Sequence, residues 1–134
     1  MRPVPKRKPS PSDPLILLVD DVADNIDVYT QFFLHRGWRT ATASNGQDGL
    51  TSAAGLRPDV IVLDLGMPGM DGWEVARRLK ADAVTRSIPI IALTGHVLGD
   101  SRRRAREAGV EDFLAKPCLP QDLAEAIKRL LPQR

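Results

Sequence analysis

The sequence has one cysteine, one tyrosine and few aromatic residues, and its charges almost balance. The single cysteine, Cys118, cannot form an internal disulfide, so we expect a reducing compartment, the cytoplasm. No apolar run approaches the roughly 18 residues that a membrane-spanning helix needs, and no apolar segment follows the N-terminal basic residues as in a secretory signal. The formal net charge of +2 lacks the large basic excess of a dedicated nucleic-acid-binding domain. A soluble protein without a membrane segment is therefore expected, and nucleic-acid binding is not.

The hydrophobic content of the chain, 43% of 134 residues, suits one compact domain with one core. Residues 1–14 differ from the rest because they hold five prolines and four basic residues. Such a segment cannot bury enough apolar surface to offset its ordering entropy, so a flexible, solvated tail is expected there. Its charge could also contact an acidic partner or nucleic acid. The folded domain is predicted over residues 15–131, with residues 132–134 as the C-terminal end.

Short apolar or alternating segments, each typical of a buried strand, recur along this domain. They are residues 15–19, 39–43, 60–63, 88–93 and 112–115. Helical patterns fill the gaps, and two of them begin with an N-cap residue, Asn45 before Asp48 and Asp71 before Glu74. The fourth helix is predicted over 101–108, and the fifth begins near Pro120. Strand and helix alternate five times, which predicts an α/β fold with a doubly wound five-stranded parallel sheet and helices on both faces.

Polar residues follow four of the predicted strands at the point where each strand ends. Asp20 and Asp21 follow the first, Asp64 ends the third, Thr94 ends the fourth and Lys116 follows the fifth. Because the carboxyl ends of parallel strands share one edge of the sheet, these side chains should converge. Three adjacent carboxylates repel one another unless a cation lies among them, and Mg²⁺ prefers oxygen ligands. A magnesium site is therefore predicted at this edge.

A phosphoryl group would give the remaining members of this set a partner. Lysine is a common phosphate ligand, a threonine hydroxyl can donate a hydrogen bond, and an aspartate can be the nucleophile that forms an acyl phosphate. Taken singly, these residues could be helix caps, turn residues or surface charges. Their joint occurrence at four strand ends favours phosphoryl chemistry.

Four segments carry a resemblance to a known family: LVDD at 18–21, LDLGMPGMDG at 63–72, ALTG at 92–95 and DFLAKP at 112–117. Together they resemble the receiver domain of two-component response regulators, over about residues 15–131. The resemblance implies a flavodoxin-like fold with sheet order 2-1-3-4-5 and five helices. It also implies that Asp64 is the phosphoacceptor, and that Asp20, Asp21, Asp64 and the backbone carbonyl of Gly66 bind Mg²⁺.

The resemblance assigns further roles near the end of the chain. Thr94 and Lys116 match the residues that hold the phosphoryl oxygens, and Phe113 matches the switch aromatic whose rotamer follows Thr94. The peptide bond before Pro117 is expected to be cis. The chain departs from the common pattern at Gly95, where alanine is usual, and carries His96 beside it, which is either a plain surface residue or a group that titrates near the phosphoryl group.

The resemblance implies a histidine kinase or a histidine phosphotransfer protein as the phosphoryl donor. The expected output surface is helix four, strand five and helix five, and helix four carries an arginine cluster that indicates an acidic protein partner or only a solvated face. A single-domain regulator is expected that is no enzyme beyond its own phosphorylation and dephosphorylation. A phosphatase of the haloacid dehalogenase type would need an acid at Gly66, and a module without phosphate chemistry would not need the complete acidic set.

Overall fold

The computed structural model describes residues 10–67, 69, 71–95 and 100–132 of the chain. Five parallel strands form one sheet in the order β2-β1-β3-β4-β5, which confirms the expected fold and strand order. The strands are β1 (Leu15–Val19), β2 (Arg39–Ala43), β3 (Val60–Asp64), β4 (Ile90–Thr94) and β5 (Asp112–Ala115). The helices between them are α1 (Ala23–His35), α2 (Gly46–Leu56), α3 (Gly72–Ala81), α4 (Ser101–Ala108) and α5 (Pro120–Leu130).

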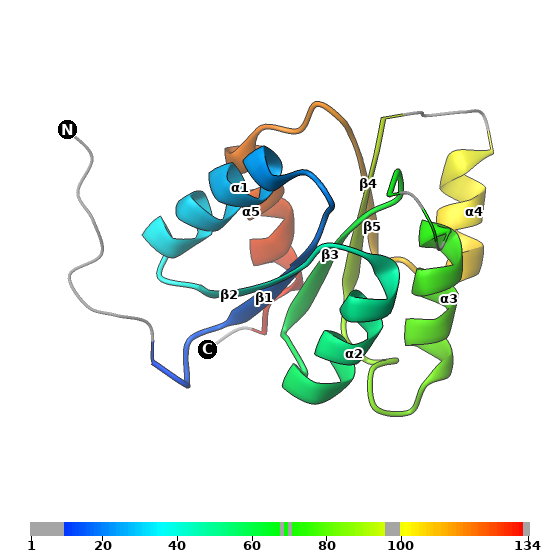
Figure 1. The fold of residues 1–134 in the computed structure, drawn as a ribbon, viewed down its shortest axis with the longest axis horizontal. Helices are drawn as coiled ribbons and strands as arrows, with labels where there is room; N and C mark the ends of the chain where they lie inside the picture. Colours follow the sequence, from blue (N-terminus) through cyan, green and yellow to red (C-terminus); the bar gives the residue numbers. More distant parts are fainter. Residues whose placement is uncertain (1–9, 68, 70, 96–99, 133–134) are drawn as a thin grey trace.

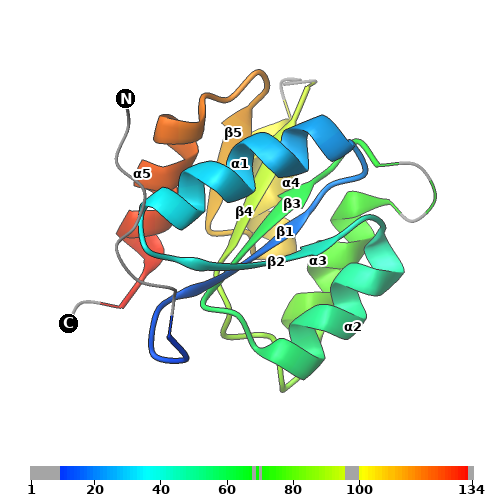
Figure 2. The same ribbon diagram turned by 60° about the vertical axis from the view of Figure 1, so that its left-hand side comes forward.

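The sheet separates two apolar layers (Figure 1). On one face, α2, α3 and α4 pack against alternate residues of the central strands, such as Leu17 and Ile61. On the other face, α1 and α5 cover the intervening residues, such as Ile16 and Val62. Figure 2 brings α1 to the front, where it crosses the sheet with α5 at its side. Because both faces are covered, every residue of β1, β3 and β4 is buried, which explains the continuous apolar runs of these strands.

β4 begins later than the sequence predicts, at Ile90 instead of residue 88. Ile88 belongs to a turn, in which its N–H donates to the carbonyl of Thr85. Pro89 has no N–H, but its carbonyl accepts from Ile61, so it contributes only an acceptor at the edge of the ladder. The first strand residue, Ile90, donates its N–H to the Glu111 carboxylate at 2.8 Å. The Glu111 side chain therefore accepts the hydrogen bond of the first N–H group of this strand.

The two predicted N-caps are present, with one difference in detail. The Asn45 side chain accepts from the N–H of Asp48, and its amide donates to the Asp48 carboxylate, a reciprocal cap. Asp71 accepts from the N–H of Trp73, the second helical position, whereas the predicted capping box uses the third. The Glu74 carboxylate binds the two arginines of the next turn instead. The helix still begins where predicted.

The predicted tail lies for the most part outside the described residues, and its last five residues form a turn. Asp13 accepts from the N–H of Ser10 at 2.7 Å, and the Arg39 guanidinium donates to the carbonyls of Pro11 and Asp13. Arg39 lies at the start of β2, so this turn contacts the edge of the sheet. Within the described part of the chain, no helix has the length and apolar character needed to cross a bilayer.

Candidate functional site

The candidate site lies at the carboxyl edge of the sheet, and strand register brings its residues there. Asp64, the last residue of β3, is in register with Leu93 of β4. Thr94, one residue further along, is in register with Ala115 of β5, and its carbonyl accepts from the N–H of Lys116 at 2.7 Å. The ends of β3, β4 and β5 therefore lie side by side, as the alternation of strands and helices predicts.

Three carboxylates meet at this edge. One oxygen from each of Asp20, Asp21 and Asp64 lies within 4.8 Å of the others. Asp20 is fully buried, Asp64 is nearly so and Asp21 is exposed, so the cluster opens to solvent on one side. Asp20 accepts a hydrogen bond from the N–H of Val22 at 2.9 Å and a longer one from the Asn25 amide at 3.4 Å. These donors fix the Asp20 carboxylate at the start of α1.

The charged form of the Asp20 carboxyl carries an electrostatic cost at this position. Burial raises the pKa of the Asp20 carboxyl above its usual range, and the negative charge of Asp64 raises it further. The hydrogen bond from Val22, the positive charge of Lys116 and the Asn25 amide act in the opposite direction. A bound cation would remove this cost, and a set of carboxylate oxygens is the donor set that Mg²⁺ prefers. The residues present therefore fit a magnesium ion.

Asp64 has a defined partner for each carboxylate oxygen. Its Oδ2 lies 2.9 Å from Nζ of Lys116, and its Oδ1 accepts from the N–H of Gly66 at 2.9 Å. The peptide bond between Lys116 and Pro117 is cis, as the resemblance implies. A methyl group at Gly66 would lie 3.5 Å from Oδ1 of Asp64, which is an ordinary contact. The position two residues after Asp64 thus borders the carboxylate directly.

Phe113 lies beside a second aromatic residue that sequence reasoning does not connect to it. Its ring is nearly parallel to that of Trp73, at 10° and with centroids 6.3 Å apart. The Arg104 guanidinium lies 4.9 Å from the centre of the Trp73 ring. These contacts join β5, the first turn of α3 and the exposed side of α4. His96, the other residue near Thr94 that the sequence singles out, lies outside the described residues.

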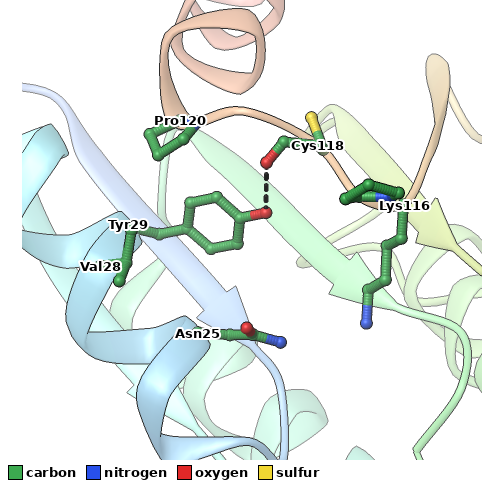
Figure 3. A pocket seen from close by; sticks show the side chains of 7 residues that line it. Asn25, Val28, Tyr29, Lys116, Cys118 and Pro120 are labelled. Atoms are coloured by element: carbon green, nitrogen blue, oxygen red, sulfur yellow. Dashed lines mark hydrogen bonds between the residues drawn. The ribbon is translucent and has the colours of Figure 1, made fainter.

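A pocket of about 450 Å³ borders the site between α1 and the segment that links β5 to α5 (Figure 3). The Tyr29 hydroxyl donates to the carbonyl of Cys118 at 2.8 Å across this pocket. Burial raises the pKa of Tyr29 to about 12, so this hydroxyl stays protonated. Asn25 and Lys116 both line the pocket, and both also bind the acidic cluster. Burial raises the pKa of the Cys118 thiol, which agrees with an inert cysteine.

The structure brings Asp20, Asp21, Asp64 and Lys116 into one site, with Thr94 at the neighbouring strand end. Sequence reasoning missed Asn25, although its place in the first turn after the acidic pair was a usable signal. It also missed the pairing of Trp73 with Phe113, which are distant in sequence.

The family comparison agrees with this geometry. Residues 16–128 match the family model described as the response regulator receiver domain. The response regulator PleD of Caulobacter vibrioides is 40% identical over 102 residues, which is 76% of this chain and 22% of PleD. The transcriptional regulatory protein PrrA of Mycobacterium tuberculosis is 36% identical over 123 residues, 92% of this chain and 52% of PrrA. The chain thus spans about half or less of these relatives.

Solved structures of receivers are similar over nearly the whole chain. The chemotaxis protein CheY4 of Vibrio cholerae has a TM-score of 0.84 at 27% identity, covering 90% of this chain and 100% of that one. The receiver domain of the sensor histidine kinase PA1611 of Pseudomonas aeruginosa, solved with a magnesium ion in its active-site cleft, has a TM-score of 0.80 at 33% identity, covering 89% and 98%. With its sheet order, its acidic cluster and these matches, the chain belongs to the family of response regulator receiver domains.

Proposed function

We propose that this receiver domain accepts a phosphoryl group on Asp64 in a Mg²⁺-dependent reaction and signals by a change of conformation. The observation that carries the proposal is the position of Asp64. Its carboxylate lies within 4.8 Å of two other carboxylates and 2.9 Å from the Lys116 ammonium. The residues proposed as nucleophile, cation ligands and phosphate ligand thus lie together.

The proposed reaction is a transfer from a phosphohistidine. A carboxylate oxygen of Asp64 attacks the phosphorus, and the new O–P bond forms as the P–N bond breaks. The electron pair stays with the imidazole of the donor, which takes up a proton. Lys116 neutralises the charge of the transferred group, and the Thr94 hydroxyl donates to one of its oxygens.

Asp20, Asp21, Asp64 and the carbonyl of Gly66 would hold the magnesium ion. Bound there, the ion would stabilise the negative charge that develops on the phosphoryl oxygens. Asn25 and the N–H of Val22 orient Asp20 beside the other two carboxylates. The fit rests on the oxygen-only donor set and on the cost of burying the Asp20 charge without a cation.

The proposal excludes turnover of external phosphate esters. An aspartyl phosphatase of the haloacid dehalogenase type carries a second acid two residues after the nucleophile, and this chain has Gly66 there. The position borders Oδ1 of Asp64, so an acid at this point would be well placed, and the glycine found there supplies no side-chain acid. The chemistry is therefore confined to phosphorylation and dephosphorylation of Asp64 itself.

The proposed donor is a histidine kinase or a histidine phosphotransfer protein that docks beside Lys116. Val28, which lines the pocket next to this lysine, is 55% exposed, and Leu119, which lies in the chain between the lining residues Cys118 and Pro120, is 59% exposed. Such side chains suit contact with the surface of a donor protein, whose histidine must reach the acidic edge. We place this exchange in the cytoplasm, where a lone cysteine stays reduced.

The proposed output surface consists of α4, β5 and α5. The arginines of α4 are all exposed, and within the described residues neither Arg102 nor Arg106 has an ion-pair partner. This uncompensated charge favours an acidic protein partner. A DNA duplex should not bind to the domain at physiological salt. Retention of such a duplex that falls steeply with salt would overturn this choice of partner.

Intact-mass spectrometry after incubation with acetyl phosphate and Mg²⁺ tests the central proposal. The expected product carries one phosphoryl group, and both Asp64→Asn and EDTA prevent its formation. An unmodified protein that also fails to bind beryllofluoride, a mimic of the phosphoryl group, would refute the proposal. Single-domain action stays a prediction, and the mass of the native protein in a cell extract tests it.

A further inference from the structure

The stack of Phe113, Trp73 and Arg104 joins the candidate switch residue to the surface of α4. Trp73 is buried, at 9% exposure, with the Phe113 ring and the Arg104 guanidinium both packed against it. Guanidinium groups bind aromatic faces through cation–π attraction and stacking. Arg103, the preceding residue, instead approaches the carboxylates of Asp100 and Glu107. One exposed arginine of α4 therefore packs on the buried Trp73 ring, whereas its neighbour pairs along the helix surface.

Trp73 is also tied to the loop that follows Asp64. Its N–H donates to the Asp71 carboxylate at 3.0 Å, which fixes the first turn of α3. The preceding residue, Gly72, packs so closely on Leu65 that a methyl group at Gly72 would lie 2.8 Å from the Leu65 backbone. Leu65 directly follows Asp64. Because these contacts are closely packed, a displacement of the loop beside Asp64 should also displace Trp73.

We propose that Trp73 and Arg104 are positioning residues that couple the acidic site to α4, because they hold Phe113 in the place it takes when Asp64 is an unmodified carboxylate. This inference rests on the proposed function and extends it to two residues outside the site. In this structure Asp64 pairs directly with Lys116, and Phe113 lies against Trp73. Phosphorylation of Asp64 replaces its direct pairing with Lys116, and a movement of Phe113 breaks its contact with Trp73.

The proposed role of Arg104 predicts the direction in which its substitution changes the affinity for beryllofluoride. Arg104 stabilises the arrangement in which Asp64 is unmodified, so its removal favours the other arrangement. A cation–π contact at a partly exposed site contributes about 0.5–1 kcal/mol, so we expect Arg104→Ala to bind beryllofluoride about two- to fivefold more tightly. Arg104→Lys keeps the charge but loses the planar group, so it should shift the affinity in the same direction. Arg103→Ala should leave the affinity unchanged.

The experiment uses tryptophan fluorescence, because the chain has only two tryptophans. Trp38→Phe leaves Trp73 as the reporter, and Trp73→Phe leaves Trp38, which packs against Phe33 on the opposite face of the sheet. On titration with beryllofluoride and Mg²⁺, the emission of Trp73 should change and that of Trp38 should not. The arginine variants are also titrated with both tryptophans present, so the result does not depend on the folding of Trp38→Phe.

Intact-mass spectrometry with acetyl phosphate separates the two proposals. If Asp64 is modified but Trp73 emission is constant, or Arg104→Ala has the affinity of Arg103→Ala, the coupling role is refuted and the proposed function stands. Weaker binding by Arg104→Ala would also refute it, because the stack would then support the modified state. If the protein neither takes up phosphate nor binds beryllofluoride, both proposals fall.

Discussion

Gly72→Ala tests how strictly the loop beside Asp64 is held by the helix that follows it. Gly72 is the first residue of α3 and is buried. A Cβ atom there would lie 2.8 Å from both Cα and Cδ2 of Leu65, and 3.3 Å from its carbonyl oxygen. The side-chain atom can rotate away, but the backbone of Leu65 cannot. Either α3 or the loop must therefore move.

The overlap between the added Cβ atom and Leu65 determines how much Gly72→Ala destabilises the domain. Carbon atoms in contact are usually about 3.5–4.0 Å apart, so the two backbones must separate by roughly 0.7 Å or more. Overpacking of this kind costs about 1–3 kcal/mol, which lowers the Tm of a domain of this size by roughly 3–15 °C. Since Leu65 adjoins Asp64, the displacement also moves the nucleophile, and we expect phosphorylation by acetyl phosphate to slow about ten- to hundredfold.

Gly55→Ala is the matched control, because an added Cβ at Gly55 meets no atom within 4 Å. Gly55 lies in α2, where alanine favours the helix by about 0.5–1 kcal/mol, so this variant should be as stable as the wild type or more so. Thermal unfolding and the phosphorylation rate are measured for both variants. If Gly72→Ala matches Gly55→Ala in both, the close approach does not hold the loop, and the reasoning is wrong.

Three further substitutions test other contacts of the site and the sheet. Asp20→Asn should raise the Tm in EDTA, because burial in the folded state raises the pKa of this carboxyl and so disfavours its charged form at neutral pH. The gain in Tm on adding Mg²⁺ should be smaller than for the wild type, and an unchanged gain would contradict the metal assignment. Tyr29→Phe should cost about 0.5–1.5 kcal/mol in urea unfolding, through loss of the bond to Cys118. Glu111→Ala should cost about 1–3 kcal/mol, because it leaves the N–H of Ile90 without its acceptor; no loss would mean that water replaces the carboxylate.

The strands and the site could be predicted from local features of the sequence. β1 and β3 are covered on both faces, so they read as unbroken apolar runs, and the residue at which each run ends marks the functional edge. Asp20 and Asp64 stand directly at these ends. Since parallel strands share one carboxyl edge, the convergence of these distant residues can be predicted without further information.

Contacts that depend on side-chain direction could not be predicted in this way. Arg103 and Arg104 are adjacent and chemically identical, yet only the rotation of α4 against α3 sends Arg104 to the face of Trp73. The sequence also predicts too early a start for β4, because the apolar run begins at Ile88, which belongs to the turn before the strand. Such contacts depend on packing between distant elements, which local periodicity does not encode.

The charges of the site explain why a divalent cation and a phosphoryl group should support each other under the proposed function. Among the described residues, the site combines three carboxylates with one ammonium group, that of Lys116, which pairs with Asp64, so its formal charge is two negatives. A divalent cation neutralises this excess. Phosphorylation then converts the single negative charge of Asp64 into the larger charge of an acyl phosphate, which strengthens the attraction for the cation. By thermodynamic linkage, a cation that binds the phosphorylated site more tightly must favour phosphorylation by the same factor. Binding of Mg²⁺ and of beryllofluoride should therefore be mutually enhancing, and Asp20→Asn, which removes one negative charge from the site, should reduce that enhancement in both directions.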